Sequence, residues 1–389
     1  MSDAVLLISD RLPIPVIGGD RLRAYRIARF LRDRGRPVHL VCFARERGDD
    51  ARAREAPARE AFETITLVRF PKAVQAARSA AALIGGGSMQ VEYHRSPEMK
   101  REVERVARRV RPRAAIAHLT RTAAYAPPGL APKRILEMTD VFFDYYRRAK
   151  RGVKRRGLLV YSVEEPRIRR FEIDCVKRFD AVVLVSEAER AKLVAAAGHP
   201  ERVHAIPNGV DEEWLDLTPA PKPRLITFHG ALGYPPNADA ALLFAREVLP
   251  KIPNARFRIV GSDPPPPVRA LSGVEVTGTV ESVVPHLLEA QVSVCPLRVS
   301  AGIQNKVLEA MALGVPVVST PAGVVGIRAE AGRDLVVADS AEAMAREVSA
   351  LLDDPGRCAR LSKAGRALVR SRYLWSQVLE PYLKLSQQG

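Results

Sequence analysis

The stretch CPLRVSAGIQNKVLEAMALGVPVVST, at residues 295–320, contains the pattern that decides the fold. An apolar run that ends at Leu297 is followed by a loop of small residues, by a helix-period segment from Gln304 to Leu313, and by a second apolar run at 316–320. Short apolar runs separated by an amphipathic segment of this length are typical of two parallel strands joined by a crossover helix. The stretch therefore predicts a βαβ unit.

The same alternation extends along the whole chain in two series. Strands are predicted in the first series at 4–9, 37–43, 65–70, 114–119, 134–138 and 181–186, with a helix at 20–34. Strands are predicted in the second series at 225–230, 256–261, 274–278, 292–297, 316–320 and 334–338, with helices at 238–249, 283–290 and 304–313. Because the strands are almost continuously apolar, we predict an α/β protein with parallel sheets covered on both faces.

The two series predict two domains, at residues 1–207 and 208–370. IPNGVDEEW at 206–214 and the Pro-rich TPAPKPR at 218–224 mark the change of composition between them. Ligands of such folds bind at the carboxyl ends of the strands, so we expect the active site in a cleft between the domains. The run of prolines at 264–267 is expected to be a surface loop and not a helix.

Composition limits the class of protein. No apolar run approaches the roughly 18 residues of a membrane-spanning helix, and Asp3 and Asp10 lie where a signal peptide would be basic and then apolar. We therefore expect a cytoplasmic protein. The four cysteines are far apart and without a histidine cluster, so we expect reduced, buried thiols and no metal site.

Positive charge is concentrated in the first domain. Residues 1–200 hold 41 of the 61 Lys and Arg and 24 of the 44 Asp and Glu, an excess of 17, whereas the remainder is neutral. Such an excess predicts a surface that meets lipid head groups, a phosphorylated acceptor or nucleic acid. A high Arg content that reflects genome composition is the alternative.

The loop and helix start after residue 297 carry the candidate site. The expected free amides of Ile303, Gln304 and Asn305, together with Arg298 and Lys306, would converge on one anion at the carboxyl end of a strand. Two cations and several N–H groups suit a diphosphate. Glu309 lies three residues after Lys306 on the same helix face, where its carboxylate can accept two ribose hydroxyls. An ordinary Lys–Glu surface pair is the alternative.

Glycines mark further candidate positions. Gly18 and Gly19 follow the first strand, and Asp20 can cap the helix after them, so this loop can approach a phosphate or be only a turn. The pattern is not G-x-G-x-x-G, which disfavours a nicotinamide or flavin cofactor. Gly230, at the end of the 225–230 strand, and Gly302 are further candidate positions at which the backbone can approach a bound ligand.

These motifs resemble glycosyltransferase family 4, which has the GT-B fold and the donor-binding pattern Glu, seven residues, then Glu-Ala-Met-Ala. The resemblance is carried by the segments Gly18–Gly19, Val185–Ser186, Ile206–Asp211, Gln304–Ala312 and Tyr373–Trp375. It extends over nearly the whole chain and is strongest to sugar transferases of bacterial exopolysaccharide loci. The fold it implies is two Rossmann-like domains with an interdomain cleft and a C-terminal helix, residues 371–389, that returns to the first domain.

The resemblance implies a retaining transfer from a UDP- or GDP-linked sugar to a hydroxyl acceptor, without a metal or another cofactor. Arg298 and Lys306 would neutralise the leaving diphosphate, Glu309 would hold the ribose, and the Gly18–Gly19 loop would face the sugar phosphate. His118 would lie against the donor sugar, although a buried core histidine is an equal alternative.

Two departures from the family pattern stand out. The first acid of the Glu-x7-Glu pattern would be residue 301, which is alanine, so the usual contact to a sugar hydroxyl must come from elsewhere. The Arg and Lys that the family places after the first strand of the second domain are also missing from HGALGYPPNADA at 229–240. Arg298 and Lys306 therefore remain as the main diphosphate cations.

The partner of the basic domain has several candidates. Basic helix-like segments at 98–113, 145–156 and 166–178 indicate docking on an anionic membrane and a lipid-linked or other anionic acceptor. A nucleic-acid-binding protein would explain the charge, but no recognisable motif supports one, so no nucleic acid is expected. Two rival classes share the fold: a nucleotide-sugar epimerase that uses Asp140 or Asp144, and a non-catalytic relative.

Overall fold

The structure is a computed structural model that describes residues 3–150, 155–300 and 302–387. The chain forms two compact units. Unit 1 comprises residues 1–206 and 379–389, and unit 2 comprises residues 207–378. Each unit is described by itself.

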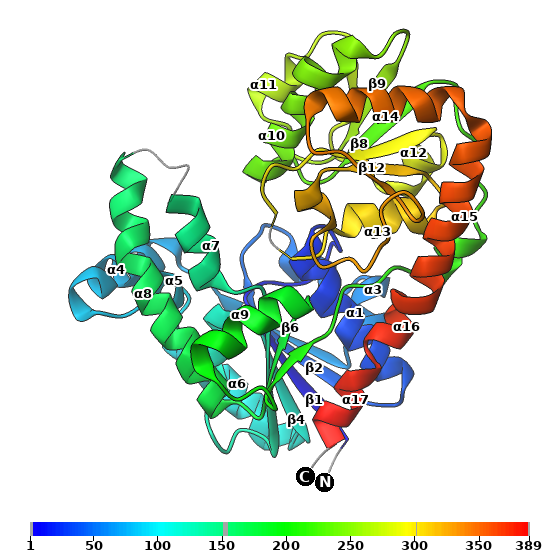
Figure 1. Cartoon of the computed structure of the whole chain (residues 1–389). Coiled ribbons are helices and arrows are strands. Elements are labelled where there is room, and N and C mark those ends of the chain that lie inside the picture. The colour runs from blue at the N-terminus through cyan, green and yellow to red at the C-terminus, as the bar shows by residue number, and fades with distance from the viewer. Residues whose placement is uncertain (1–2, 151–154, 301, 388–389) are drawn as a thin grey trace. The chain divides into compact units, whose positions relative to one another are not determined.

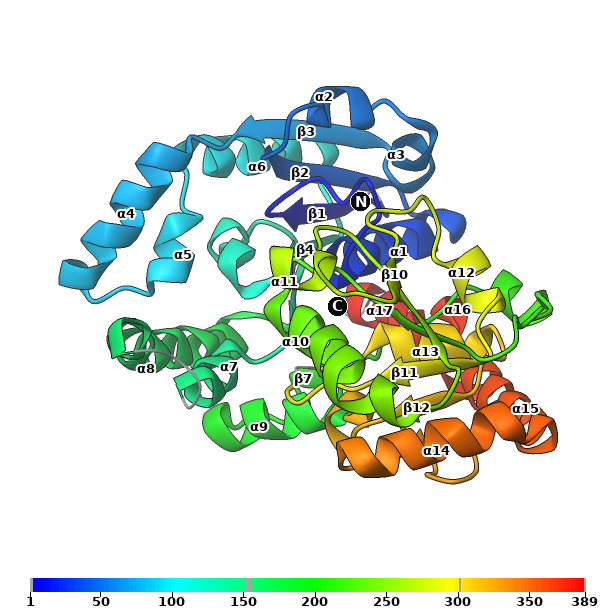
Figure 2. The same cartoon turned by 90° about the horizontal axis from the view of Figure 1, so that it is seen from above.

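Unit 1 is built on a parallel sheet of seven strands in the order β3-β2-β1-β4-β5-β6-β7 (Figures 1 and 2). The strands are β1 (Val5–Ser9), β2 (Val38–Ala44), β3 (Thr64–Arg69), β4 (Ala114–His118), β5 (Lys133–Thr139), β6 (Ala181–Leu184) and β7 (Val203–Ala205). The first six lie where the apolar runs predict them, whereas β7 was not predicted. Ser9 of β1 lies opposite Cys42 of β2, and His118 of β4 lies opposite Glu137 of β5, so the carboxyl ends of these strands share one edge.

Helices cover both faces of this sheet. Val103 of α6 (Pro97–Val110), Val176 of α8 (Arg155–Arg178) and Leu193 of α9 (Glu187–Ala197) join one core with the strands. On the other side, α1 (Gly19–Asp33) contacts β2, and the C-terminal helix α17 (Glu380–Gln387) contacts β5. The other short elements are α2 (Asp49–Arg52), α3 (Ala56–Ala61), α4 (Lys72–Gly85), α5 (Met89–Tyr93), η1 (Thr120–Tyr125) and α7 (Phe142–Ala149).

A buried ion pair ties three of these elements together. Arg23 of α1 places Nε and Nη2 at 2.8 and 2.9 Å from the two carboxylate oxygens of Glu137 in β5. Both side chains are fully buried, and the hydroxyl of Tyr382 in α17 donates to the same carboxylate. The C-terminal helix α17 is thus bound into unit 1, whereas residues 371–378 of the predicted returning segment belong to unit 2.

Unit 2 repeats the arrangement with six parallel strands in the order β10-β9-β8-β11-β12-β13. The strands are β8 (Leu225–His229), β9 (Arg256–Val260), β10 (Val274–Val276), β11 (Val292–Cys295), β12 (Val317–Ser319) and β13 (Val336–Val337). The helices α13 (Asn305–Ala312) and α14 (Ala341–Asp353) both contact β11 and β12 and lie on opposite sides of the sheet (Figure 1). The remaining elements are η3 (Glu212–Asp216), α10 (Pro235–Leu243), η4 (Phe244–Val248), η5 (Leu249–Lys251), α11 (Pro266–Arg269), α12 (Val284–Leu288), η6 (Pro321–Val324), α15 (Pro355–Arg372) and α16 (Trp375–Val378).

Two local predictions were wrong. The run of prolines at 264–267 is not only loop, because Pro266 and Pro267 form the first turn of α11, where the missing N–H groups need no partner within the helix. Asp20 does not cap α1. The helix begins at Gly19 after Gly18, and the Asp20 carboxylate pairs with Arg11 instead.

The basic helices differ from the amphipathic membrane helices that the sequence indicated. Met99 and Val103 on α6, and Ile168 and Val176 on α8, are buried in the core of unit 1. Their apolar faces are therefore used for folding and are not exposed to a bilayer. Part of the 145–156 segment lies outside the described residues. None of the helices in the described part of the chain is long and apolar enough to cross a membrane.

Candidate active site

The strand orders place a topological switch point in each unit. The order reverses between β1 and β4 in unit 1 and between β8 and β11 in unit 2. At such a point, the loops after two adjacent parallel strands run in opposite directions and leave a crevice at the carboxyl ends of the strands. Ligands of such folds bind in this crevice. In unit 2 these ends are His229–Gly230 and the loop after Cys295, which leads into α13.

Lys306 in the first turn of α13 is held by neutral groups. Its Nζ donates to Oδ1 of Asn237 at 2.9 Å and to Oε1 of Gln304 at 3.1 Å. The side chain is partly buried, and this desolvation lowers the pKa of Lys306 from its usual value, although Cys295 and Glu309 act in the opposite direction. Both hydrogen-bond acceptors are uncharged amides, which leaves the ammonium charge available to an anion.

Glu309, one turn further along α13, contacts the end of β8. Its Oε2 lies 2.7 Å from Nε2 of His229, and the other ring nitrogen of that histidine is buried without a hydrogen-bond partner among the described residues. The Glu309 side chain is 17% exposed, so it is reachable from solvent. The structure thus brings Lys306 and Glu309 together at His229–Gly230, as the helix spacing predicts.

Gly230 is required by the packing at this point. Its φ of 151° lies in a region that side-chain-bearing residues rarely adopt, and a Cβ there would lie 3.0 Å from Nδ2 of Asn237 and 3.2 Å from Cε of Lys306. A Cβ on Gly261, at the end of the neighbouring β9, would lie only 1.9 Å from the Gly230 carbonyl oxygen. The two glycines allow the strand ends to approach, which brings Asn237 and Lys306 together.

The loop before α13 differs slightly from the prediction. The helix begins at Asn305, with Gln304 as its N-cap residue, so the predicted start at Gln304 is one residue too early. Gly302, at φ 63°, and Ile303 are buried, and Nε2 of Gln304 donates to the Ser300 hydroxyl at 2.8 Å. Residue 301, where the family pattern has its first acid, lies outside the described residues.

Three of the segments that carry the family resemblance, Ile206–Asp211, Gln304–Ala312 and Tyr373–Trp375, are in contact through residues of unit 2. Nδ2 of Asn208 donates to Oδ1 of Asn305 at 2.8 Å, which joins the Ile206–Asp211 segment to the start of α13. On the same segment, Gly209 lies so close to Trp375 that a Cβ would be 2.8 Å from the Trp375 backbone nitrogen. The Ile-Pro-Asn-Gly-Val-Asp segment therefore contacts the start of α13 directly.

Arg298 has other partners in this structure. Its guanidinium forms ion pairs with Glu247 at 3.1 Å and Asp239 at 3.8 Å, and its side chain is 55% exposed. Binding a diphosphate would require Arg298 to exchange these carboxylates for phosphate oxygens. Its predicted convergence with Lys306 stays a prediction.

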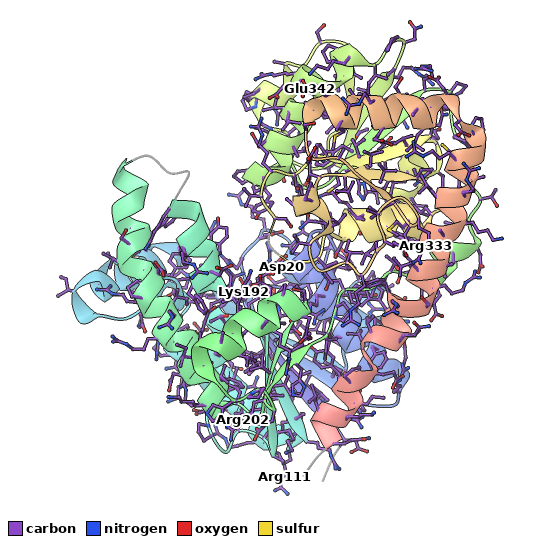
Figure 3. The ribbon with its side chains drawn as sticks, in the orientation of Figure 1. Asp20, Arg111, Lys192, Arg202, Arg333 and Glu342 are labelled. Atoms are coloured by element: carbon purple, nitrogen blue, oxygen red, sulfur yellow. The ribbon has the colours of Figure 1, made fainter. Side chains whose placement is uncertain are left out.

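The remaining predicted residues belong to unit 1. Gly18 is the N-cap residue of α1, and Gly19 is its first residue. The neighbouring Asp20 lies at one end of the strands of unit 1, and Arg111 and Arg202 lie at the other end (Figure 3). His118 ends β4, is 1% exposed, and has no hydrogen-bond partner for either ring nitrogen among the described residues. Burial lowers the pKa of His118 to about 4, against the opposing effect of Asp20 and Asp10.

Sequence reasoning missed several functional candidates. His229 and Asn237 contact Glu309 and Lys306, and in unit 1 Asp10, Arg45 and Arg121 form a charged cluster at the strand ends. The sequence contained a signal for three of these residues, because each lies where a buried strand ends. Asp10 and Arg45 directly follow β1 and β2, and His229 is the last residue of β8. Their partners come from distant segments and required the structure.

The cysteines are free thiols, and the described residues hold no metal cluster. Cys42, Cys175 and Cys295 are buried and Cys358 is partly buried, and none forms a disulfide. Within residues 3–150, 155–300 and 302–387, no group of three or more His, Cys, Asp or Glu side chains is arranged to hold a metal ion.

Similar solved structures define the class to which the fold belongs. Anabaena HepE in complex with UDP and glucose is similar over 98% of both chains, with a TM-score of 0.70 and 15% identity. Sucrose-phosphate synthase from Thermosynechococcus elongatus is similar over 99% of this chain and 98% of that chain, with a TM-score of 0.75 and 16% identity. TarM is similar over 100% of this chain and 99% of the TarM chain, with a TM-score of 0.71 and 11% identity. The fold is that of GT-B glycosyltransferases.

Family models identify the family. The model described as Glycosyltransferase Family 4 matches residues 17–214, just over half of the chain. The model described as Glycosyl transferases group 1 matches residues 223–354. The chain belongs to glycosyltransferase family 4 and is a glycosyltransferase of the GT-B type. No curated protein sequence matches it.

Proposed function

We propose that the protein transfers a sugar from a nucleoside diphosphate sugar to a hydroxyl acceptor, with retention of configuration and without a metal ion. The observation that carries the proposal is the grouping of Lys306, Glu309 and Gly230 at the switch point of unit 2. UDP is the first donor base to test, because HepE, which has a similar fold, was solved with UDP and with UDP-glucose.

Lys306 supplies the electrostatic part of this mechanism. Departure of a nucleoside diphosphate leaves negative charge on its terminal phosphate, and a pre-positioned cation in a partly desolvated site stabilises that charge. The ammonium is already oriented by Asn237 and Gln304, so little reorganisation is needed when the phosphate arrives. Arg298 is proposed as a second cation that leaves Glu247 when the donor binds.

Glu309 supplies recognition of the nucleoside. One carboxylate oxygen lies against His229, and a carboxylate can accept further hydrogen bonds from vicinal hydroxyls. We propose that these are the ribose hydroxyls of the donor. Gly18, Gly19 and His118 are proposed to contact the donor sugar phosphate and the sugar.

The acceptor is proposed to be part of a polysaccharide, glycolipid or related glycoconjugate, presented at the inner face of the membrane. The excess of 17 positive charges in residues 1–200 supports an anionic acceptor or an anionic surface. Sedimentation with vesicles that contain anionic lipid, at low salt, tests the membrane part. Recovery of all the protein in the supernatant would contradict it.

Incubation with UDP-, GDP-, ADP- and TDP-linked sugars tests the transferase proposal. We expect slow donor hydrolysis that releases the nucleoside diphosphate from one base class, at an unchanged rate in the presence of EDTA. Proton NMR of the first-formed sugar should show the anomer of the donor. Inversion, or activity that EDTA abolishes, would contradict the corresponding part of the proposal.

A further inference from the structure

Unit 1 has a pocket of about 310 Å³ at the carboxyl edge of its sheet, next to the ends of β1 and β2. The pocket is lined by four cationic and two acidic side chains: Arg11, Arg45, Lys72, Arg121, Asp10 and Glu46. Its volume is at the lower end of that of small-molecule sites. A molecule of the size of a small phosphorylated polyol fits such a space.

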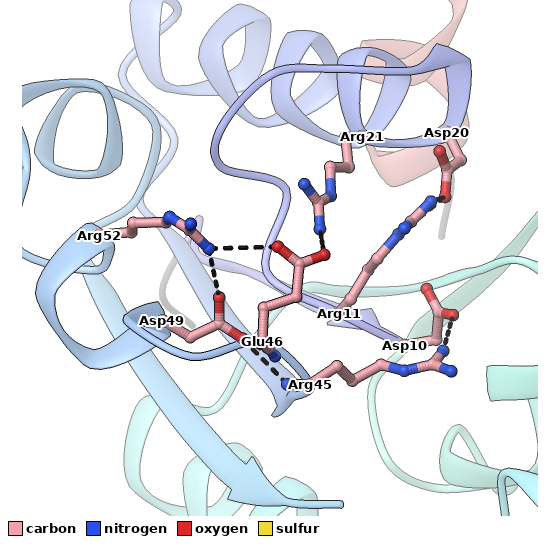
Figure 4. Close-up of polar contacts among 8 residues, drawn as sticks. All are labelled: Asp10, Arg11, Asp20, Arg21, Arg45, Glu46, Asp49 and Arg52. Atoms are coloured by element: carbon pink, nitrogen blue, oxygen red, sulfur yellow. Dashed lines mark hydrogen bonds and ion pairs between the residues drawn. The ribbon is translucent and has the colours of Figure 1, made fainter. Parts of the chain in front are cut away.

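The cations exceed the acids around this pocket. Arg11 pairs with Asp20, and Glu46 is shared by Arg21 and Arg52 (Figure 4). A single oxygen of Asp10 pairs with Arg45 at 3.0 Å and with Arg121 at 2.9 Å. One carboxylate therefore compensates only one of two guanidinium groups. Lys72 is exposed and pairs with no acid among the described residues.

The neighbouring histidines do not add to this charge. Burial lowers the pKa of His94, which lies 3.9 Å from Asp10, to about 4, and it lowers that of His118 to a similar value. Both rings are therefore neutral near pH 7. The residues that line the pocket and the groups in their ion-pair network comprise six cations and four carboxylates. The cations are Arg11, Arg21, Arg45, Arg52, Lys72 and Arg121, and the carboxylates are Asp10, Asp20, Glu46 and Asp49. The remaining two positive charges match a phosphate monoester dianion.

The pocket is also pre-organised. The Asp49 carboxylate accepts from the backbone N–H groups of Arg45 and Glu46 at 2.9 and 3.0 Å, which fixes the loop after β2. The Arg45 guanidinium lies 4.5 Å above the ring of Phe70. The second oxygen of Asp10 is buried and has no hydrogen-bond partner among the described residues. Buried polar atoms without a partner are rare in folded proteins.

We infer that this pocket binds a phosphate group of the acceptor, through Arg45, Arg121 and Lys72. The inference rests on the proposed transferase function and names the acceptor class: a hydroxyl compound that carries a phosphate. Asp10 holds the two guanidinium groups side by side, so that they present a pair of donors to the phosphate oxygens. The phosphate belongs either to a soluble sugar or polyol phosphate or to a lipid head group.

Calorimetric titration with glycerol 3-phosphate, and with glycerol as the uncharged control, tests the inference. We expect binding of glycerol 3-phosphate only, and at least tenfold weaker binding to the Arg45→Gln/Lys72→Ala double variant. The Lys100→Ala/Arg108→Gln variant removes the same charge from the surface of α6 and should bind like the wild type. If the double variant folds poorly, Lys72→Ala alone serves in its place, because it breaks no ion pair among the described residues. We expect it to weaken binding about tenfold.

A second arm identifies the source of the phosphate. Vesicles of phosphatidylcholine with phosphatidic acid should bind the wild type more than the Arg45→Gln/Lys72→Ala variant if the natural phosphate is a head group. If wild type and variant bind glycerol 3-phosphate with equal affinity and also bind these vesicles equally, the inference is overturned. Titration of the same samples with UDP, GDP, ADP and TDP separates the two proposals. If a nucleotide binds but wild type and variant do not differ towards the phosphate compounds, this inference alone is overturned. If none of the four nucleotides binds, the proposed function is overturned.

Discussion

Nζ of Lys306 lies 2.9 Å from Oδ1 of Asn237, so the ammonium group of the candidate donor site is held by a neutral amide. The amide orientation is fixed, because Nδ2 of Asn237 donates to the Ala231 carbonyl at 2.9 Å. A carboxylate in this position would neutralise the lysine while keeping the shape of the side chain.

Asn237→Asp should therefore weaken binding of UDP at least tenfold near pH 7. The new carboxylate would compete with the diphosphate for Lys306 and repel it, and charge-assisted pairs are about twice as strong as neutral ones. Calorimetric titration with UDP measures the effect. Asn254→Asp, on a distant turn of the same unit, adds the same charge as a control, and equal affinities for the two variants would contradict the assignment.

Glu309→Ala should remove discrimination between UDP and 2′-deoxy-UDP. A carboxylate bonded to a ribose hydroxyl contributes about 1.5–3 kcal/mol, so the wild type should prefer UDP by about tenfold or more. The variant should bind both nucleotides with the weaker affinity. Competition titrations give the ratio, and a preference for UDP that survives in Glu309→Ala would show that the ribose is recognised elsewhere.

Burial of His118 should make the folded protein less stable at acidic pH. Its pKa is about 4 in the folded protein, against 6.5 without the protein environment. Between these values the unfolded chain binds a proton that the folded chain excludes, so stability is complete above pH 6.5 and falls as the pH drops towards 4. Each unit of difference between the two pKa values corresponds to about 1.4 kcal/mol, so the free energy of unfolding falls by about 3 kcal/mol at most.

Calorimetric melting between pH 4 and 8 measures this dependence. His118→Leu removes the titrating ring and should flatten part of the acid-side loss, while His94, whose pKa is also lowered to about 4, retains its share. Identical pH profiles for the wild type and His118→Leu would show that His118 is not buried in its neutral form.

Glu137→Gln should destabilise unit 1 by about 3–5 kcal/mol. The substitution removes the charge that compensates Arg23 in a fully buried pair, and an uncompensated buried charge is costly. Urea unfolding gives the free energy. Glu60→Gln is the matched control, because its pair with Arg29 is on the surface and should contribute less than about 1 kcal/mol. Similar losses for both variants would contradict the role of burial.

The order of strands and helices could be predicted because each element carries its own pattern. The apolar runs that became β1 and β8 are buried at every position, as parallel strands covered on both faces require. The three-residue β7 is too short to show such a run. The prolines of α11 were misjudged, because proline excludes the interior of a helix but is tolerated in its first turn.

The candidate site was predictable only within one helix. Lys306 and Glu309 share a face because of helical periodicity, which the sequence displays. Their partners His229 and Asn237 come from β8 and α10, and the packing that brings these elements together depends on Gly230 and Gly261. Likewise, the pairing of Arg298 with Glu247 depends on the position of η4, which no local pattern specifies.

The central claim is that the first turn of α13 binds the diphosphate of the donor through Lys306. Titration of the wild type and Lys306→Ala with UDP and with uridine, which lacks the phosphates, tests it most directly. We predict that the variant binds UDP about 100-fold more weakly or worse, binds uridine as the wild type does, and loses activity by several orders of magnitude. Lys251→Ala, which removes an exposed lysine of the same unit, should behave like the wild type. An affinity of Lys306→Ala for UDP within a few-fold of that of the wild type would contradict the account.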